Sequence, residues 1–428
     1  MEYTEFTSKM KEEYTILAPD IFPIHLKLVA QVFRQSGYKI EVLKYTGKKV
    51  LDTGLKYIHN DMCYPAICSL GQLLYAVTCG DYDPHKIALI HFQTGGGCRA
   101  SNYIKLLRKA LKNMGMEYIP VISLNFSGFE KHSGFKLTLP LLYKCFISLV
   151  YGDMLMLLYN QIRPYVIKDG EAERVLDKWI AELSSQFIKN KGLSFSAIRR
   201  NMEKIAADFA DVGLTGEKKP KVGIVGEIYV KYAPFGNNDL ENFLFSQGCE
   251  YMVPGVLAFF QYCLYNPIED NKLYGGGLKG EIVSKIALKA MSIMENIMAK
   301  ALAPYPKFTS SCEFGHLVKL AQKVMNTGVK MGEGWCLPAE MAELIEKGYP
   351  NIVCAQPFGC LPNHIIGKGI ARHIKEVYPE ANICQVDYDP GATKVNQENR
   401  IKLMLAVARE NMQEKTSANT ENSPAPLV

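Results

Sequence analysis

Short apolar strands alternate with amphipathic helices in both halves of this chain. In the first half, strands are expected at residues 15–18, 39–43, 86–92 and 118–124, with helices at 24–34 and 103–113. In the second half, strands are expected at 222–225, 351–355 and 382–386, with helices at about 363–376 and from about 395. This alternation predicts an α/β fold in which helices cover both faces of parallel sheets.

The pattern changes between the two halves. Residues 151–216 show helical periodicity without a strand signal, so we expect a helical insert there. The insert separates an N-terminal α/β domain, residues 13–150, from a C-terminal α/β domain, residues 217–413. Residues 414–428 are rich in Ser, Thr, Asn and Pro, which predicts a disordered tail.

Charge and hydropathy exclude several classes of protein. The 49 Lys and Arg exceed the 43 Asp and Glu by six, and they are spread thinly, which indicates a solvated surface and no nucleic-acid groove. The longest apolar stretch, residues 137–159, is interrupted by polar residues and by Pro140, so we expect a buried segment and no membrane span. The first residues lack the pattern of a signal peptide, so a cytoplasmic location is expected, where the 12 cysteines stay free of disulfides.

Two cysteine loops occupy corresponding places in the two halves. One reads Gln93-Thr-Gly-Gly-Gly-Cys98 and the other Gln356-Pro-Phe-Gly-Cys360, and each leads from a strand into a helix. Cys63 and Cys336 also stand at helix starts, because each precedes Pro by two residues. Backbone N–H groups and the helix dipole at such a start favour a thiolate, by up to about 1 kcal/mol each at exposed sites, and thiolates bind metals.

Packing is the alternative interpretation for each cysteine taken singly. Cys354, inside a strand, and Cys312 fit either a core position or a metal ligand, while Gly97 and Gly359 would let the backbone approach a cofactor closely. We assign a further set to packing: Cys68, Cys79, Cys145, Cys263 and Cys384.

Other motifs are weaker. Gly95-x-Gly97-x-x-Ala100 fits a dinucleotide fingerprint, but the strand that follows lacks the acidic residue that binds a ribose. Glu227, Glu333 and His364 lie near the cysteine loops and are candidate catalytic groups. The alternative is a solvated loop for Glu227 and an ordinary core or surface position for His364.

Four strings together resemble a known family: Asn60-Asp-x-Cys63-Tyr-Pro, Gln93 to Tyr103, Gly332-Glu-Gly-Trp335 and Asn351 to His364. They are similar to the 2-hydroxyacyl-CoA dehydratase superfamily, and more narrowly to the dehydratase-like C-terminal part of activator-fused proteins. The resemblance covers about residues 13–410. It implies two Rossmann-like domains with an oxygen-sensitive iron–sulfur cluster at their interface, which receives single electrons from an ATP-hydrolysing iron–sulfur activator. In the dehydratases, that electron makes a ketyl radical on the thioester, so that a hydroxyl group can leave.

The resemblance also implies which cysteines bind the cluster. Cys63, Cys98, Cys354 and Cys360 match the family's cysteines, whereas Cys336 departs from the usual apolar residue. Four thiolates would close a 4Fe-4S cluster, three would leave one iron open for substrate, and six, with Cys336 and Cys312, could hold the double cubane of related proteins.

Function and partners follow as expectations. The chain contains no nucleotide-binding motif, so the activator would be a separate chain, and the protein itself would be a homodimer or heterodimer. Its substrate would be an acyl-CoA or another small molecule. A double-cubane reductase and a non-catalytic electron carrier or metal-binding scaffold are the alternatives.

Overall fold

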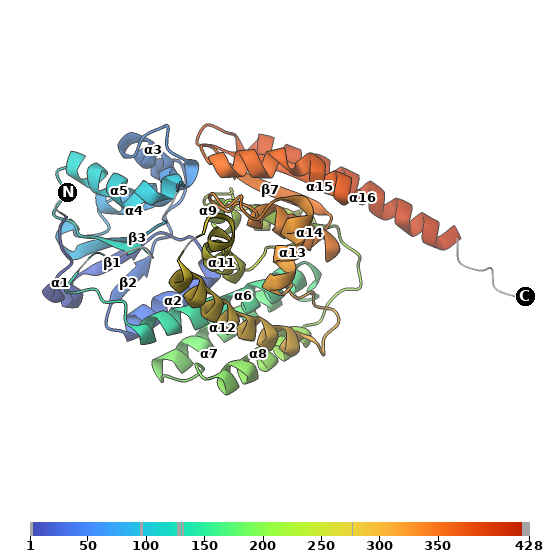
Figure 1. The fold of residues 1–428 in the computed structure, drawn as a ribbon, viewed down its shortest axis with the longest axis horizontal. Helices are drawn as coiled ribbons and strands as arrows, with labels where there is room; N and C mark the ends of the chain where they lie inside the picture. Colours follow the sequence, from blue (N-terminus) through green and yellow to red (C-terminus); the bar gives the residue numbers. More distant parts are fainter. Residues whose placement is uncertain (1–2, 95–96, 126–129, 131, 276, 422–428) are drawn as a thin grey trace, which may run out of the picture.

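Two parallel β-sheets form the centres of the fold (Figure 1). The structure is a computed structural model that describes residues 3–94, 97–125, 130, 132–275 and 277–421. Strand order is β2-β1-β3-β4 in the first sheet and β6-β5-β7-β8 in the second, so each sheet places its second, first, third and fourth strand side by side. The strands are β1 Thr15–Ala18, β2 Lys39–Val42, β3 Ile87–Gln93, β4 Val121–Asn125, β5 Lys221–Gly226, β6 Glu250–Met252, β7 Asn351–Pro357 and β8 Asn382–Tyr388. The α/β class expected from the alternating pattern is confirmed.

Helices cover the first sheet, and two of them, Pro23–Gln35 and Tyr103–Asn113, lie close to where the sequence predicts them. Apolar side chains of β1 and β3 are buried because helices pack on both faces. The elements are α1 Ser8–Glu13, α2 Pro23–Gln35, α3 Lys48–Tyr57, α4 Tyr64–Thr78, α5 Tyr103–Asn113 and the 3-10 turns Pro84–Lys86 and Arg99–Asn102.

The helical region begins earlier than expected. Helix α6 spans Leu139–Ile162, so the expected boundary at residues 150 and 151 falls inside one continuous helix. Gly152 lets α6 pack closely on α2, since a Cβ there would lie 2.2 Å from the His25 ring. Helices α7, Glu171–Ile188, and α8, Phe195–Ala210, follow, with the 3-10 turn Arg163–Tyr165 before them.

One helix is long and apolar enough to span a membrane. It covers Leu139–Tyr165, and 67% of its most apolar window is buried inside the protein. Among the described residues no other helix has this property. Such burial is typical of the core helix of a water-soluble protein, as expected for this stretch.

Two long helices, α11 and α12, precede the last strands of the second sheet and were not expected from the sequence. Helix α12 contacts α8, and α11 contacts α6, so this pair packs on the helical region (Figure 1). The helices of this half are α9 Ile228–Tyr232, α10 Leu240–Ser246, α11 Val256–Tyr274, α12 Leu278–Leu302, α13 Phe314–Val324, α14 Cys336–Glu346, α15 Ala371–Val377 and α16 Lys394–Glu421.

Two details of this half differ from expectation. The helix expected at about 363–376 begins as a π-helix, Asn363–Lys368, and continues as α15. Helix α16 reaches Glu421 and extends away from the body (Figure 1), so residues 414–421 are helical where we expected a disordered tail. Residues 422–428 lie outside the described part.

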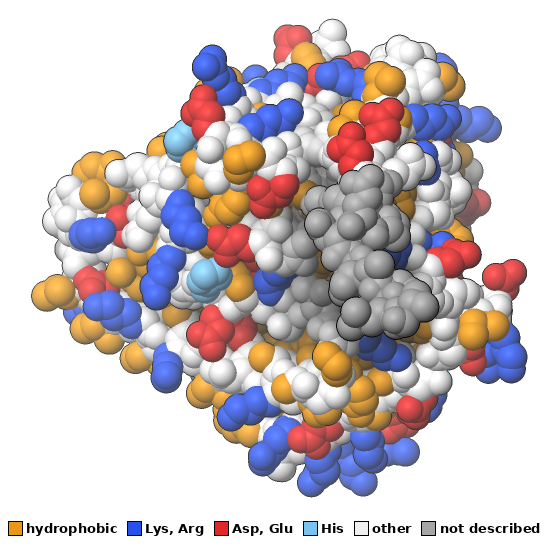
Figure 2. All heavy atoms as spheres, turned by 90° about the vertical axis from the view of Figure 1, so that its right-hand side faces the viewer, with side chains coloured by type: hydrophobic (Ala, Val, Ile, Leu, Met, Phe, Trp, Pro, Cys, Tyr) orange, Lys and Arg blue, Asp and Glu red, His pale blue; other side chains and the backbone are white. Residues whose placement is uncertain are grey.

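Charged side chains are mixed on the face that includes the end of α16. Figure 2 shows Lys and Arg among Asp, Glu and apolar side chains on that face. This distribution agrees with the thin spread of charge along the sequence.

Candidate functional site: a thiol junction between the sheets

Loops from both sheets meet at the site that we call the thiol junction, defined by Cys63, Cys98 and Cys360. Hydrogen bonds join the loops: the Tyr64 N–H donates to the carbonyl of Phe358 at 2.9 Å. Arg99 Nη1 donates to the carbonyls of Asp61, at 3.1 Å, and Gly359, at 2.9 Å. The loop after β7 is therefore fastened to the two loops of the first sheet that carry Cys63 and Cys98.

Each cysteine of the junction precedes a helical segment, as expected. Cys63 caps α4, Cys98 caps the 3-10 turn before α5, and Cys360 lies just before the helical residues that lead into the π-helix. Cys63 and Cys360 are 5% and 8% exposed, and Cys98 is half-buried. The Cys98 thiol interacts electrostatically with both other thiols.

Two buried carboxyl groups border the same thiols. Glu227 follows β5, and its Oε2 accepts a hydrogen bond from Val230 N at 3.0 Å. Glu333, in the loop before α14, accepts one from Ile228 N at 3.0 Å. Burial raises the pKa of both carboxyls, and the charge of Glu333 raises the pKa of Glu227 further. The pair therefore keeps a proton at neutral pH, and the two candidate glutamates, Glu227 and Glu333, lie close to each other.

The thiols themselves are not poised as thiolates. Burial raises the pKa of Cys98 to about 11 and also raises the pKa of Cys63 and of Cys360. The backbone N–H groups at the helix starts act in the opposite direction but are outweighed, in part because Glu227 lies nearby. The helix starts therefore do favour the thiolates, as expected, but in the protein without a bound cation desolvation penalises the charged form more.

Two residues that the sequence analysis did not single out complete the junction. The Tyr103 Oη lies 2.9 Å from the Cys63 Sγ, and Arg99 links the loops as described above. Both belong to the string Gln93 to Tyr103, and their closeness to Cys98 in sequence was the available signal.

Both candidate glycines of the cysteine loops allow close contacts with protein atoms. A Cβ on Gly97 would lie 2.7 Å from the Met331 sulfur. Gly359 has φ +73°, and a Cβ there would lie 2.9 Å from the Cα of Cys63. The close approach that we expected is real, but it brings loops together, and binding of a cofactor by Gly97 or Gly359 stays a prediction.

The other candidate ligands have different surroundings. Cys354 is fully buried in β7 and accepts a hydrogen bond from Gln356 Nε2 at 3.6 Å. Cys336, at the start of α14, contacts Glu340, which forms a buried ion pair with Lys231 at 2.9 Å. None of these contacts is with the thiol junction, so the roles of Cys354 and Cys336 as ligands stay predictions.

The contacts of Cys312 and His364 are also with residues outside the thiol junction. The backbone N–H of Cys312 donates to Glu343 Oε1 at 2.6 Å. His364 is partly exposed and lies 4.0 Å from Asp387, so its nearest charged partner is outside the junction. Of the cysteines assigned to packing, Cys68 is fully buried, whereas Cys263 is exposed, contrary to expectation.

The potential ligand atoms of the junction are sulfurs, the element through which proteins hold iron–sulfur clusters. Thiolates are the ligands that such clusters take, and the three thiols come from both domains, with two acidic groups beside them. Within the described residues, no three His, Cys, Asp or Glu side chains lie close enough together to hold a metal ion. Asn363, just behind Cys360, is 1% exposed, and its side-chain amide has no hydrogen-bond partner.

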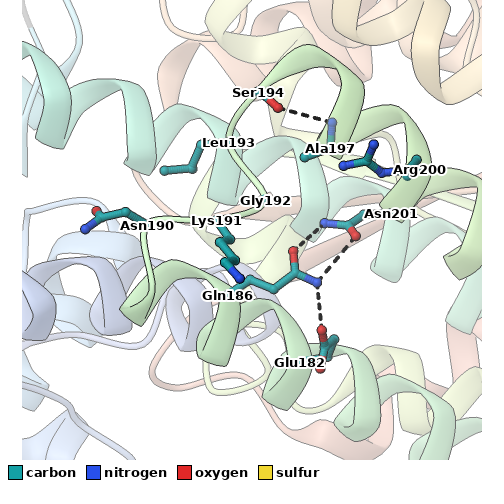
Figure 3. A pocket seen from close by; sticks show the side chains of 10 residues that line it. All are labelled: Glu182, Gln186, Asn190, Lys191, Gly192, Leu193, Ser194, Ala197, Arg200 and Asn201. Atoms are coloured by element: carbon teal, nitrogen blue, oxygen red, sulfur yellow. Dashed lines mark hydrogen bonds between the residues drawn. The ribbon is translucent and has the colours of Figure 1, made fainter.

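A cavity of about 470 Å³ lies elsewhere, in the turn between α7 and α8 (Figure 3). Its lining includes Gln186 and Asn201, which hydrogen-bond to each other at 2.8 Å. Lys191 and Arg200 also line it, and the lining contains no cysteine. This cavity is thus separate from the candidate residues.

Fold and site together define an α/β protein with two parallel sheets and a thiol junction between them. No protein-family model matches the chain, and no curated protein is significantly similar to it.

Proposed function

We propose that this chain binds an iron–sulfur cluster through Cys63, Cys98 and Cys360 and acts as a reductase or dehydratase component with a separate ATP-hydrolysing activator. The observation that supports the proposal is that the loops carrying these three cysteines are hydrogen-bonded to one another between the two domains, beside Glu227 and Glu333. The order of the parallel strands in each sheet supports the Rossmann-like part of the resemblance. Ligands of such sheets bind beyond the carboxyl ends of the strands, which is where Cys98 and Cys360 follow β3 and β7.

Three cysteines favour a cluster with one open iron over the larger double cubane. When bound, such a cluster would supply single electrons and an iron that takes a substrate oxygen. The chain would supply the rest of the chemistry: the protonated member of the Glu227 and Glu333 pair holds a proton at the junction, and it can give this proton to a departing hydroxide, which leaves as water.

Replacing single cysteines tests the proposal. Anaerobically purified protein is expected to be brown and to contain about four irons per chain and acid-labile sulfide. Cys63→Ser, Cys98→Ser and Cys360→Ser should each lose most of this iron. Cys68→Ser is the matched control, since Cys68 is buried in α4 and should cost only about 1 to 3 kcal/mol of stability.

The iron content also separates the alternatives. A folded parent protein without iron or sulfide contradicts the proposal. About twice the iron, with losses in Cys336→Ala and Cys354→Ala, would replace it with the double-cubane reductase. A full cluster whose EPR spectrum never responds to substrates would favour the electron carrier.

Exposed apolar side chains around the junction favour the docking of a protein partner there. Met331, Phe358, Leu361 and Ile365, which we call the apolar collar, are 56%, 45%, 65% and 61% exposed. Met331 contacts Gly97, and Phe358 and Leu361 flank the Gly359-Cys360 pair. Exposed apolar groups clustered in this way are typical of interaction sites.

We predict that Leu361→Gln and Ile365→Gln slow reduction by the ATP-dependent donor and leave reduction by dithionite unchanged. Ile188→Gln, an exposed apolar residue of α7, serves as the control. Equal rates for all variants with both reductants would rule out the collar as the docking surface.

A further inference from the structure

The buried phenol of Tyr103 lies against the thiol of Cys63. The distance from Oη to Sγ is 2.9 Å, and the two residues are 7% and 5% exposed. A tyrosine is protonated at neutral pH, since its ordinary pKa is about 10. Once Cys63 binds a metal as a thiolate it has no proton to donate, so the hydroxyl of Tyr103 must be the donor.

Contacts around its ring hold Tyr103 in place. Its ring meets the edge of His91, with centroids 5.5 Å apart at 73°. His91 is fixed in turn, by Ser69 Oγ at 3.0 Å from Nε2 and by the Phe92 carbonyl at 2.8 Å from Nδ1. Tyr103 is also the first residue of α5, so its backbone is fixed by the helix. The donor is therefore in position before any ligand binds.

We propose that Tyr103 is a positioning residue whose hydroxyl hydrogen-bonds the Cys63 sulfur and raises the reduction potential of the bound cluster. This inference rests on the proposed function. Reduction adds negative charge to the cluster and its sulfur ligands, and a hydrogen-bond donor stabilises that charge. Without the donor, the same cluster accepts an electron at a more negative potential.

The chain offers a matched control. Cys79 and Tyr45 form a second cysteine–tyrosine pair, with Sγ and Oη 3.5 Å apart, and Cys79 ends α4 far along the helix from Cys63. Tyr45→Phe removes a hydroxyl beside a sulfur that does not belong to the thiol junction. It therefore reports what the loss of such a hydroxyl does to the protein in general.

Anaerobic redox titrations of the parent, Tyr103→Phe and Tyr45→Phe test the inference. Iron and sulfide are measured first, and the cluster is then followed by EPR. Tyr103→Phe is expected to keep the parent's iron content and to shift the midpoint potential to a more negative value, whereas Tyr45→Phe should leave the potential unchanged. An unchanged potential in iron-replete Tyr103→Phe overturns the inference and leaves the proposed function standing.

A second substitution covers the case in which Tyr103→Phe loses iron. Site-specific 3-fluorotyrosine at position 103 keeps the hydroxyl and makes it a stronger donor, so the potential should shift to a more positive value. No shift, or a negative one, overturns the inference. A parent protein without iron would instead overturn the proposed function, and this inference with it.

Discussion

Burial governs the acidic groups that follow the first strand of each sheet. Asp20 follows β1 and Glu227 follows β5, so the two occupy corresponding places. Burial raises the pKa of Asp20 to about 6, while Lys44 and Lys27 act in the opposite direction. Its Oδ1 has no hydrogen-bond partner, and Tyr229, whose hydroxyl also lacks one, lies near it. Ionising Asp20 in the folded protein is therefore unfavourable.

Asp20→Asn is expected to stabilise the protein above pH 6. The folded protein holds the Asp20 proton more tightly than the unfolded chain does, so wild-type stability falls as the pH rises from about 4 through 6. The variant should be more stable by about 3 kcal/mol at pH 7 to 8, and the difference should vanish toward pH 4. Urea unfolding across this range measures it, with Asp52→Asn, an exposed carboxylate, as the control. A constant difference at every pH would contradict the assignment.

At the scale of elements, one carboxylate from α6 holds the start of α11. Asp153 accepts hydrogen bonds from Val256 N at 2.7 Å and Leu257 N at 2.9 Å, and its Oδ1 lies 2.8 Å from His25 Nε2. Gly255 permits this contact, since a Cβ there would lie 2.7 Å from Asp153 Oδ2. Asp153 thus joins α2, α6 and α11, which belong to the first domain, the helical region and the second domain.

We predict that Asp153→Asn lowers the free energy of unfolding by about 1 to 3 kcal/mol, because one buried N–H of α11 loses its acceptor. Chemical denaturation of the purified protein measures the change. Asp177→Asn, an exposed residue on α7, should change the free energy by less than about 0.5 kcal/mol. Equal stability of Asp153→Asn and the parent would show that the α11 start does not depend on the carboxylate.

At the scale of the whole molecule, the two sheets have the same strand order, and the third strand of each leads into a cysteine loop. Cys98 follows β3, and Cys360 follows β7. The loops meet because Gly359 lets the backbone before Cys360 approach Cys63. The junction therefore depends on contact between the domains and on no single domain.

Gly359→Ala is expected to open this contact and lower iron content. Its φ of +73° costs a residue with a Cβ about 1 to 2 kcal/mol, and the Cβ would in addition meet Cys63. Gly348→Ala is the matched control, because Gly348 has φ +84° and no atom within 4 Å of its Cβ position. Iron retained equally in both variants would show that close contact between these loops is not needed for the cluster.

The sequence by itself determined the elements and the loops that bear chemistry. Periodicity is a local property, so it located the strands from β1 to β8 apart from the short β6, together with the helices α2, α5, α7, α8, α15 and α16. The proline two residues after Cys63 indicated the helix start there. Periodicity missed α11 and α12, whose apolar residues do not follow one simple stripe, and it also missed α1, α3, α9, α10 and α13. It ended the last helix too early. The strings around the cysteines also sufficed to name Glu227 and Glu333.

Only the tertiary structure decided which of these groups share a site and whether they are protonated there. Sequence spacing does not tell that Gly359, next to Cys360, lies against Cys63, nearly 300 residues away, while Cys354, six residues before Cys360, packs inside β7. Nor does a helix start reveal that desolvation outweighs its dipole and keeps the thiols protonated. Distances between loops and the removal of water are properties of the packed domains, and for that reason the hydrogen bond of Tyr103 to Cys63 emerged only from the fold.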